Sequence, residues 1–92
     1  MNISDQQKNE IKRELISYLA PKKEIYKIVI FGSFITSSSP NDIDVAIFQN
    51  SNGNYLSLAM KYRRNTRKLS KKIPIDIVPL KKEWVHQDNG SV

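Results

Sequence analysis

Three aspartates in apolar segments are the residues of this sequence whose types and spacing point to chemistry. Asp42 and Asp44 stand one residue apart in "DIDVAIF", and Asp76 lies inside "IPIDIVPL". Apolar segments of this kind form strands, in which a buried carboxylate is destabilising unless its charge is compensated. Residues i and i+2 of a strand share a face, with Cα atoms roughly 7 Å apart. Asp42 and Asp44 are therefore expected side by side, and Asp76 joins them if its strand is a neighbour.

Two kinds of compensation suit converging carboxylates. Lys or Arg side chains from a neighbouring helix could pair with them, or a hard divalent cation could bind them. Carboxylate sites that leave positions open for substrate phosphates are typical of Mg²⁺ in nucleotidyl transfer. Taken singly, Asp42 could be a turn cap after Pro40, and Asp76 could be the partner of a buried arginine. Their joint occurrence favours a metal site.

Gly32 and Ser33 follow a separate apolar segment, "IYKIVIF", shortly before the first aspartate. A glycine at the end of a strand lets the backbone approach a phosphate closely, and the serine offers a hydroxyl group and an N–H. A Gly-Ser pair alone is a common turn. Ahead of an Asp-x-Asp strand, it predicts the phosphate-binding half of the same site.

Basic residues are distributed unevenly along the chain. The formal net charge is +6, and seven of the 15 Lys and Arg residues fall within residues 61–72. A basic surface attracts nucleotides, nucleic acid or an acidic protein face, although a solvated helix face is the plainer interpretation. The candidates for phosphate contacts are Lys61, Arg63, Arg64 and Arg67.

Composition excludes several classes of protein. Without cysteine there are no disulfides or thiolate metal sites, and the single histidine, His86, argues against His-based metal sites and Ser-His-Asp catalysis. No apolar run approaches the length of a membrane span, and the N-terminus does not resemble a secretory signal. The 92 residues are expected to form one cytoplasmic domain, residues 1–92.

The periodicity predicts helices alternating with strands. A helix begins at Ser4, with a capping box to Gln7, and stops at Pro21. Strands are expected over residues 25–31, 42–48 and 73–80. A second long helix is expected over residues 55–72, with Tyr62 at its rim and Leu56, Ala59, Met60 and Leu69 facing the core. A last helical turn is predicted around Trp84.

This order of elements predicts a small α/β (α+β) fold with a mixed sheet of about three strands and flanking helices. Three strands make a small sheet, so an edge could be completed by a partner chain.

These residues resemble a known family. A strand ending in Gly-Ser, a loop, Asp-x-Asp on the next strand and a lone Asp on a later strand are the signature of the DNA polymerase β-like nucleotidyltransferase superfamily. "FGS", "NDIDVAIF" and "IDIVPL" match it in character and order over roughly residues 25–80. The small size most resembles the minimal nucleotidyltransferases, which are antitoxin partners of HEPN-domain proteins.

The resemblance implies a role for each matching residue. Gly32 and Ser33 would hold ATP or another nucleoside triphosphate, Asp42 and Asp44 would bind two Mg²⁺ ions, and Asp76 would bind one metal and help to activate the acceptor hydroxyl. It implies transfer of AMP to an acceptor such as a HEPN-like toxin partner.

One stretch departs from the family pattern. Where members carry arginine after Gly-Ser, this chain has Phe34, Ile35 and Thr36. Each lost guanidinium removes a charge-assisted hydrogen bond of about 1–3 kcal/mol, which the basic helix could replace. A catalytically weak antitoxin-like module that acts by docking is therefore an alternative, and a nucleic-acid-binding domain is a third.

Overall fold

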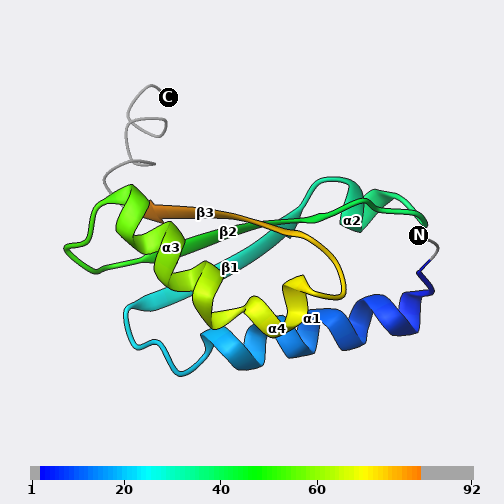
Figure 1. Cartoon of the computed structure of the whole chain (residues 1–92), viewed down its shortest axis with the longest axis horizontal. Coiled ribbons are helices and arrows are strands. Elements are labelled where there is room, and N and C mark those ends of the chain that lie inside the picture. Colours follow the sequence, from blue (N-terminus) through cyan, green and yellow to red (C-terminus); the bar gives the residue numbers. More distant parts are fainter. Residues whose placement is uncertain (1–2, 82–92) are drawn as a thin grey trace.

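A three-stranded mixed sheet with helices on one face makes up the fold in the computed structural model of the chain, which describes residues 3–81 (Figure 1). The strand order is β1-β2-β3, with β1 and β2 antiparallel and β2 and β3 parallel. The elements are α1 (Asp5–Leu19), β1 (Ile25–Phe31), α2 (Ser33–Thr36), β2 (Ile43–Gln49), α3 (Tyr55–Asn65), α4 (Arg67–Ser70) and β3 (Ile75–Lys81). The predicted fold class is confirmed.

The first helix begins where the sequence predicts. The Ser4 side chain accepts a hydrogen bond from the Gln7 backbone N–H, and the Gln7 side chain accepts one from the Ser4 N–H, which completes the capping box. Leu15 and Leu19 are fully buried against the sheet. The helix ends at Leu19, ahead of Pro21.

The core lies between the sheet and a layer made of α1, α3 and α4 (Figure 1). Alternate residues of β2 (Ile43, Val45 and Ile47) are fully buried in it, and Ile77 of β3 is 2% exposed. Successive side chains of a strand point to opposite faces of the sheet. Asp44 and Asp76 are therefore on the face turned away from the helical layer, where carboxylates do not enter the core.

The predicted second helix is two helices, because the chain turns at Thr66. The Thr66 hydroxyl donates hydrogen bonds to the carbonyls of Tyr62 (3.0 Å) and Arg63 (3.3 Å). A threonine hydroxyl that bonds the carbonyl four residues earlier bends a helix. As a result, α3 ends at Asn65, and the short α4 starts at Arg67.

The predicted core face of this region is wrong at two residues. Leu56 is 67% exposed and Met60 54% exposed, while Leu58, Ala59 and Leu69 are buried. Tyr62, expected at the rim, is fully buried, and its hydroxyl donates to the Glu24 carboxylate. The helix is thus rotated so that the aromatic ring fills the core and the Leu56 and Met60 side chains face outward.

No helix among residues 3–81 is long and apolar enough to cross a membrane. The predicted helical turn around Trp84, and His86 with it, lie outside the described residues.

The Tyr62 hydroxyl generates a test of the core. Tyr62→Phe removes its hydrogen bond to Glu24 (3.0 Å) and should lower the free energy of unfolding by about 0.5–1.5 kcal/mol, measured by urea denaturation. Tyr26→Phe, at a ring that is 49% exposed, is the control and should leave stability unchanged. Equal stability of the two variants would contradict a stabilising hydrogen bond between Tyr62 and Glu24.

Candidate active site

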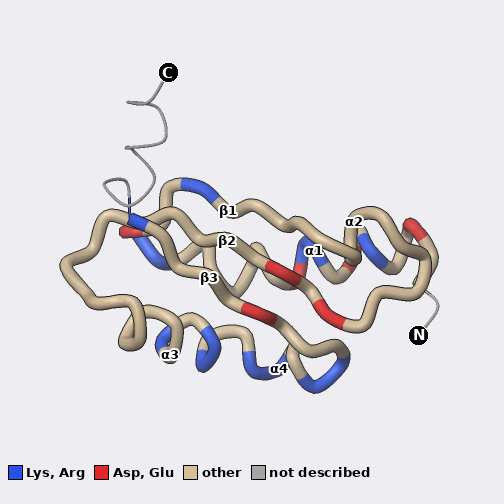
Figure 2. The backbone as a smooth tube through the Cα atoms, turned by 90° about the horizontal axis from the view of Figure 1, so that it is seen from above, with Lys and Arg blue, Asp and Glu red and all other residues tan. Residues whose placement is uncertain are grey.

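Asp44 and Asp76 are direct neighbours across the sheet. The parallel register pairs Asp44 with Asp76, and the antiparallel register pairs Asp44 with Phe31 at the end of β1. Asp42 lies one residue before β2 rather than inside the predicted strand. Figure 2 shows the three acidic positions gathered at one end of the sheet. The structure therefore brings together the carboxylates that the sequence singled out.

The environment of Asp44 is electrostatically unfavourable for its charge. Burial raises the pKa of the Asp44 carboxyl above its ordinary value, and the charges of Asp42 and Asp76 raise it further. Cations do not offset this repulsion among residues 3–81, because the ion pairs there are Lys61–Glu24 and Lys72–Glu14. Pairing with a Lys or Arg of the basic helix, which the sequence left open, is therefore wrong for the described residues.

Position 32 requires glycine, because of its backbone conformation and because the Asp44 carboxylate lies against it. Its backbone has φ +78° and ψ −155°, a region that is essentially restricted to glycine. A Cβ atom built on Gly32 would overlap the Oδ2 atom of Asp44. The Gly-Ser turn and the aspartate strand therefore form one continuous surface, in which the missing side chain makes room for the carboxylate.

The residue after Ser33 is buried, an environment in which arginine is rarely found. Ser33 is exposed and begins α2, but Phe34 is fully buried in the core. The Lys8 ammonium of α1 lies 5.8 Å from the centre of the Phe34 ring and donates to the Ser37 carbonyl. The position next to the Gly-Ser turn thus anchors α2 to the core. No pattern in the sequence indicated this contact of Lys8.

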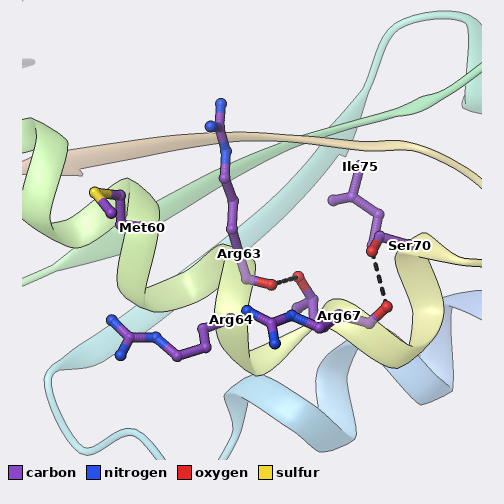
Figure 3. A pocket seen from close by; sticks show the side chains of 7 residues that line it. Met60, Arg63, Arg64, Arg67, Ser70 and Ile75 are labelled. Carbon is purple, nitrogen blue, oxygen red and sulfur yellow. Dashed lines mark hydrogen bonds between the residues drawn. The ribbon is translucent and has the colours of Figure 1, made fainter.

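An open pocket of about 600 Å³ lies between the α3–α4 segment and the start of β3 (Figure 3). The residues that line it are Met60, Arg63, Arg64, Thr66, Arg67, Ser70 and Ile75. Three of the four basic residues that the sequence proposed for phosphate contacts therefore share one pocket. Figure 2 places this basic segment alongside β3, on the side of the sheet away from β1.

Lys61, the fourth of these basic residues, is engaged elsewhere. Its ammonium donates to the Glu24 carboxylate (2.8 Å) and lies 5.8 Å from the centre of the Tyr62 ring. Burial by itself raises the pKa of Glu24, but hydrogen bonds from Lys61, the backbone and Tyr62 outweigh it and hold that pKa below its ordinary value. Lys61 thus joins α3 to the turn before β1 and does not line the arginine pocket.

The donor atoms at the aspartate end of the sheet suit a hard cation. Carboxylate oxygens are the ligands that Mg²⁺ prefers, and the lack of a side chain at Gly32 leaves room for the Asp44 carboxylate among them. Among residues 3–81, however, no group of three or more His, Asp or Glu side chains is arranged so that it could hold a metal ion as it stands. Side-chain rotation of the aspartates would have to precede metal binding.

A mixed sheet with Gly-Ser at the end of one strand and paired aspartates on the next two defines a nucleotidyltransferase domain. A family model described as polymerase beta, nucleotidyltransferase matches residues 13–88, so the chain belongs to this family. The matched range includes every aspartate of the site and the Gly-Ser turn, and it supports nucleotidyl transfer as the general function. No curated protein and no solved structure matches the chain.

The contact of Gly32 with Asp44 predicts an energetic coupling. Gly32→Ala should lower the free energy of unfolding by about 1–3 kcal/mol or more, since it adds backbone strain to the steric overlap. Asp44→Ala should restore part of this loss, because the Asp44 Cβ lies 3.6 Å from the added atom, an ordinary contact. A double-mutant cycle measured by urea denaturation should give a coupling on the order of 1 kcal/mol. A coupling of zero would refute the overlap.

The raised pKa of Asp44 predicts how stability depends on pH. Because the carboxyl binds its proton more tightly in the folded state, its ionisation destabilises the fold as pH rises through the folded pKa, and the effect vanishes below the ordinary value of 3.8. In buffer with EDTA, Asp44→Asn should raise the melting temperature at pH 7 and leave it unchanged below that value. Asp5→Asn, in the exposed first turn of α1, should give no such gain. An equal melting temperature at pH 7 would contradict the repulsion.

Proposed function

We propose that the protein is a Mg²⁺-dependent nucleotidyltransferase that moves AMP from ATP to the hydroxyl group of an acceptor. The observation that carries this proposal is the pairing of Asp44 with Asp76 across two strands, beside a glycine that leaves room for the Asp44 carboxylate. The charges of Asp42 and Asp76 raise the pKa of Asp44 in addition to burial, and no ion pair among residues 3–81 offsets them, so the cluster is destabilising unless a ligand compensates it. The polymerase beta family match supplies the reaction class.

Each residue of the site has a role in this proposal. Asp42 and Asp44, completed by Asp76, would hold the two Mg²⁺ ions, which neutralise charge on the phosphates and polarise the α-phosphorus. Gly32 lets the backbone approach the triphosphate, and the exposed Ser33 supplies a hydroxyl group and an N–H to it. These contacts orient the α-phosphate toward the acceptor.

The reaction is an in-line displacement at phosphorus. The acceptor oxygen forms a bond to the α-phosphorus, the bond from that phosphorus to the oxygen bridging to the β-phosphate breaks, and pyrophosphate leaves. The proton of the acceptor hydroxyl passes to the carboxylate of Asp76. This side chain is exposed on an edge strand, which favours a large acceptor.

We also propose that the acceptor hydroxyl belongs to a partner protein of the HEPN type, whose toxicity the transfer would silence. The support is the resemblance of the Gly-Ser turn and the aspartate strands to those of minimal nucleotidyltransferases. A second candidate function, neutralisation by docking without catalysis, is favoured by one observation. Phe34, where family members carry arginine, is fully buried and offers nothing to a phosphate.

Transfer of label tests the enzyme assignment. The protein should transfer AMP from ATP labelled at the α-phosphate to the product of the neighbouring gene when Mg²⁺ is present. Asp44→Asn and Asp76→Asn should each lower the rate by about 100-fold or more, and Asp5→Asn is the matched carboxylate control. The enzyme assignment would be wrong if wild type and Asp44→Asn transfer equally little label while both still neutralise the partner. That result would favour the docking function instead.

A further inference from the structure

The outward face of α3 carries apolar side chains that the core does not use. Leu56 and Met60 are one helical turn apart on α3, and Arg63 continues the same stripe three residues later. Arg67 follows at the start of α4 and lines the same pocket as Met60 and Arg63. Leu56 is 67% and Met60 54% exposed. Exposed leucine and methionine in a row with arginines form a surface of the composition that protein interfaces have, since Met and Arg are enriched there.

The arginines of this stripe are available to a ligand. Among residues 3–81, no carboxylate lies within ion-pair distance of Arg63, Arg64 or Arg67, since the ion pairs there are Lys61–Glu24 and Lys72–Glu14. The three side chains gather around the pocket of about 600 Å³ (Figure 3), where Ile75 adds apolar surface. A partner that fits must therefore combine negative charge with an apolar side chain.

The position of the pocket relates it to the aspartates. Ile75 lines the pocket and immediately precedes Asp76 on β3, and in Figure 3 Arg63 extends from α3 toward that strand. Figure 2 shows the basic segment running beside β3, with α4 next to the acidic end of the sheet. A segment held by the arginines would consequently reach Asp76 around the edge of β3.

The pocket arginines are better placed to bind the acceptor than to bind the triphosphate of the nucleotide. Gly32 and Ser33 follow β1, and β2 separates β1 from β3. Neighbouring strands are about 4.8 Å apart, so roughly 10 Å of sheet lies between the Gly-Ser turn and the strand beside the arginines. Nucleic acid is also disfavoured, because no aromatic side chain among residues 3–81 lines the pocket to stack a base.

We propose that the arginine pocket and the stripe above it form the docking site for an acidic segment of the acceptor protein. The arginines would pair with its carboxylates, Leu56 and Met60 would receive an apolar side chain, and the segment would present its hydroxyl group beside Asp76. The proposal rests on the proposed function for the hydroxyl, but the docking itself can be measured separately.

A binding experiment tests the docking. The probe is a fluorescein-labelled peptide in which Glu and Asp alternate with Leu around one Tyr, and its twin carries Lys at each acidic position. Fluorescence anisotropy should show that the protein binds the acidic peptide and does not bind its Lys twin. Arg63→Gln/Arg64→Gln/Arg67→Gln should weaken this binding about tenfold or more, since three exposed ion pairs are lost, and glutamine preserves helix propensity.

Two further variants separate docking from general charge and from folding. Arg13→Gln/Lys23→Gln/Lys27→Gln removes three positive charges from exposed positions that do not line the pocket and should change the affinity less than threefold, an effect of long-range attraction only. Leu56→Ser/Met60→Ser should weaken binding severalfold through the apolar contact. Circular dichroism checks that each variant is folded, and equal affinity of wild type and the pocket triple variant would overturn the proposal.

The remaining outcomes distinguish the other ligands and the other hypothesis. The proposal would be overturned in favour of nucleic acid if the protein binds a mixed-sequence single-stranded RNA more tightly than the acidic peptide and the pocket variant loses this RNA binding. A tenfold loss of ATP affinity in that variant, with peptide binding intact, would assign the arginines to the triphosphate. Asp44→Asn should keep peptide binding while label transfer is lost. If wild type binds the peptide but transfers no label, the enzyme assignment fails and the docking site stands.

Discussion

The repulsion among three carboxylates at one end of a small sheet is the constraint on which the rest of the site depends. Asp44 stands between Asp76 on the next strand and Asp42 just before its own strand, and both charges raise its pKa in addition to burial. The fold does not relieve this repulsion with its own cations among residues 3–81. In the proposed function, a bound cation would relieve this repulsion.

The apolar core holds the aspartates in this arrangement. Ile43, Val45 and Ile47 are fully buried on the helical side of β2, so the register of the strand is fixed by the residues between the polar ones. A slip of one residue would move the carboxylate of Asp44 into the core. Glycine at position 32 then completes the arrangement, because any side chain there would meet that carboxylate. Packing on one face of the sheet thus determines chemistry on the other.

The basic residues divide into two groups with different tasks. Lys61 and Lys72 are held by Glu24 and Glu14 and connect α3 and the segment before β3 to the remaining structure. The arginines of the pocket lack such partners among the described residues, and they share the pocket with Ile75 of the edge strand β3. The domain therefore has an acidic end, at Asp44 and Asp76, and a basic pocket that Ile75 of the same edge strand lines. In the proposed function, the acidic end takes the nucleotide with its cations and the basic pocket takes an acidic acceptor segment.

The sequence by itself determined the strands, the capped first helix, the fold class and the aspartates with the Gly-Ser turn, because each depends on local periodicity or on a short motif. Only the tertiary structure decided which side of α3 is buried, since Tyr62 reaches Glu24 and rotates Leu56 and Met60 outward. The burial of Phe34, at a position where family members carry arginine, also depends on residues far apart in the chain. So does the choice of which basic residues are paired, because an ion pair requires a partner that sequence spacing does not reveal.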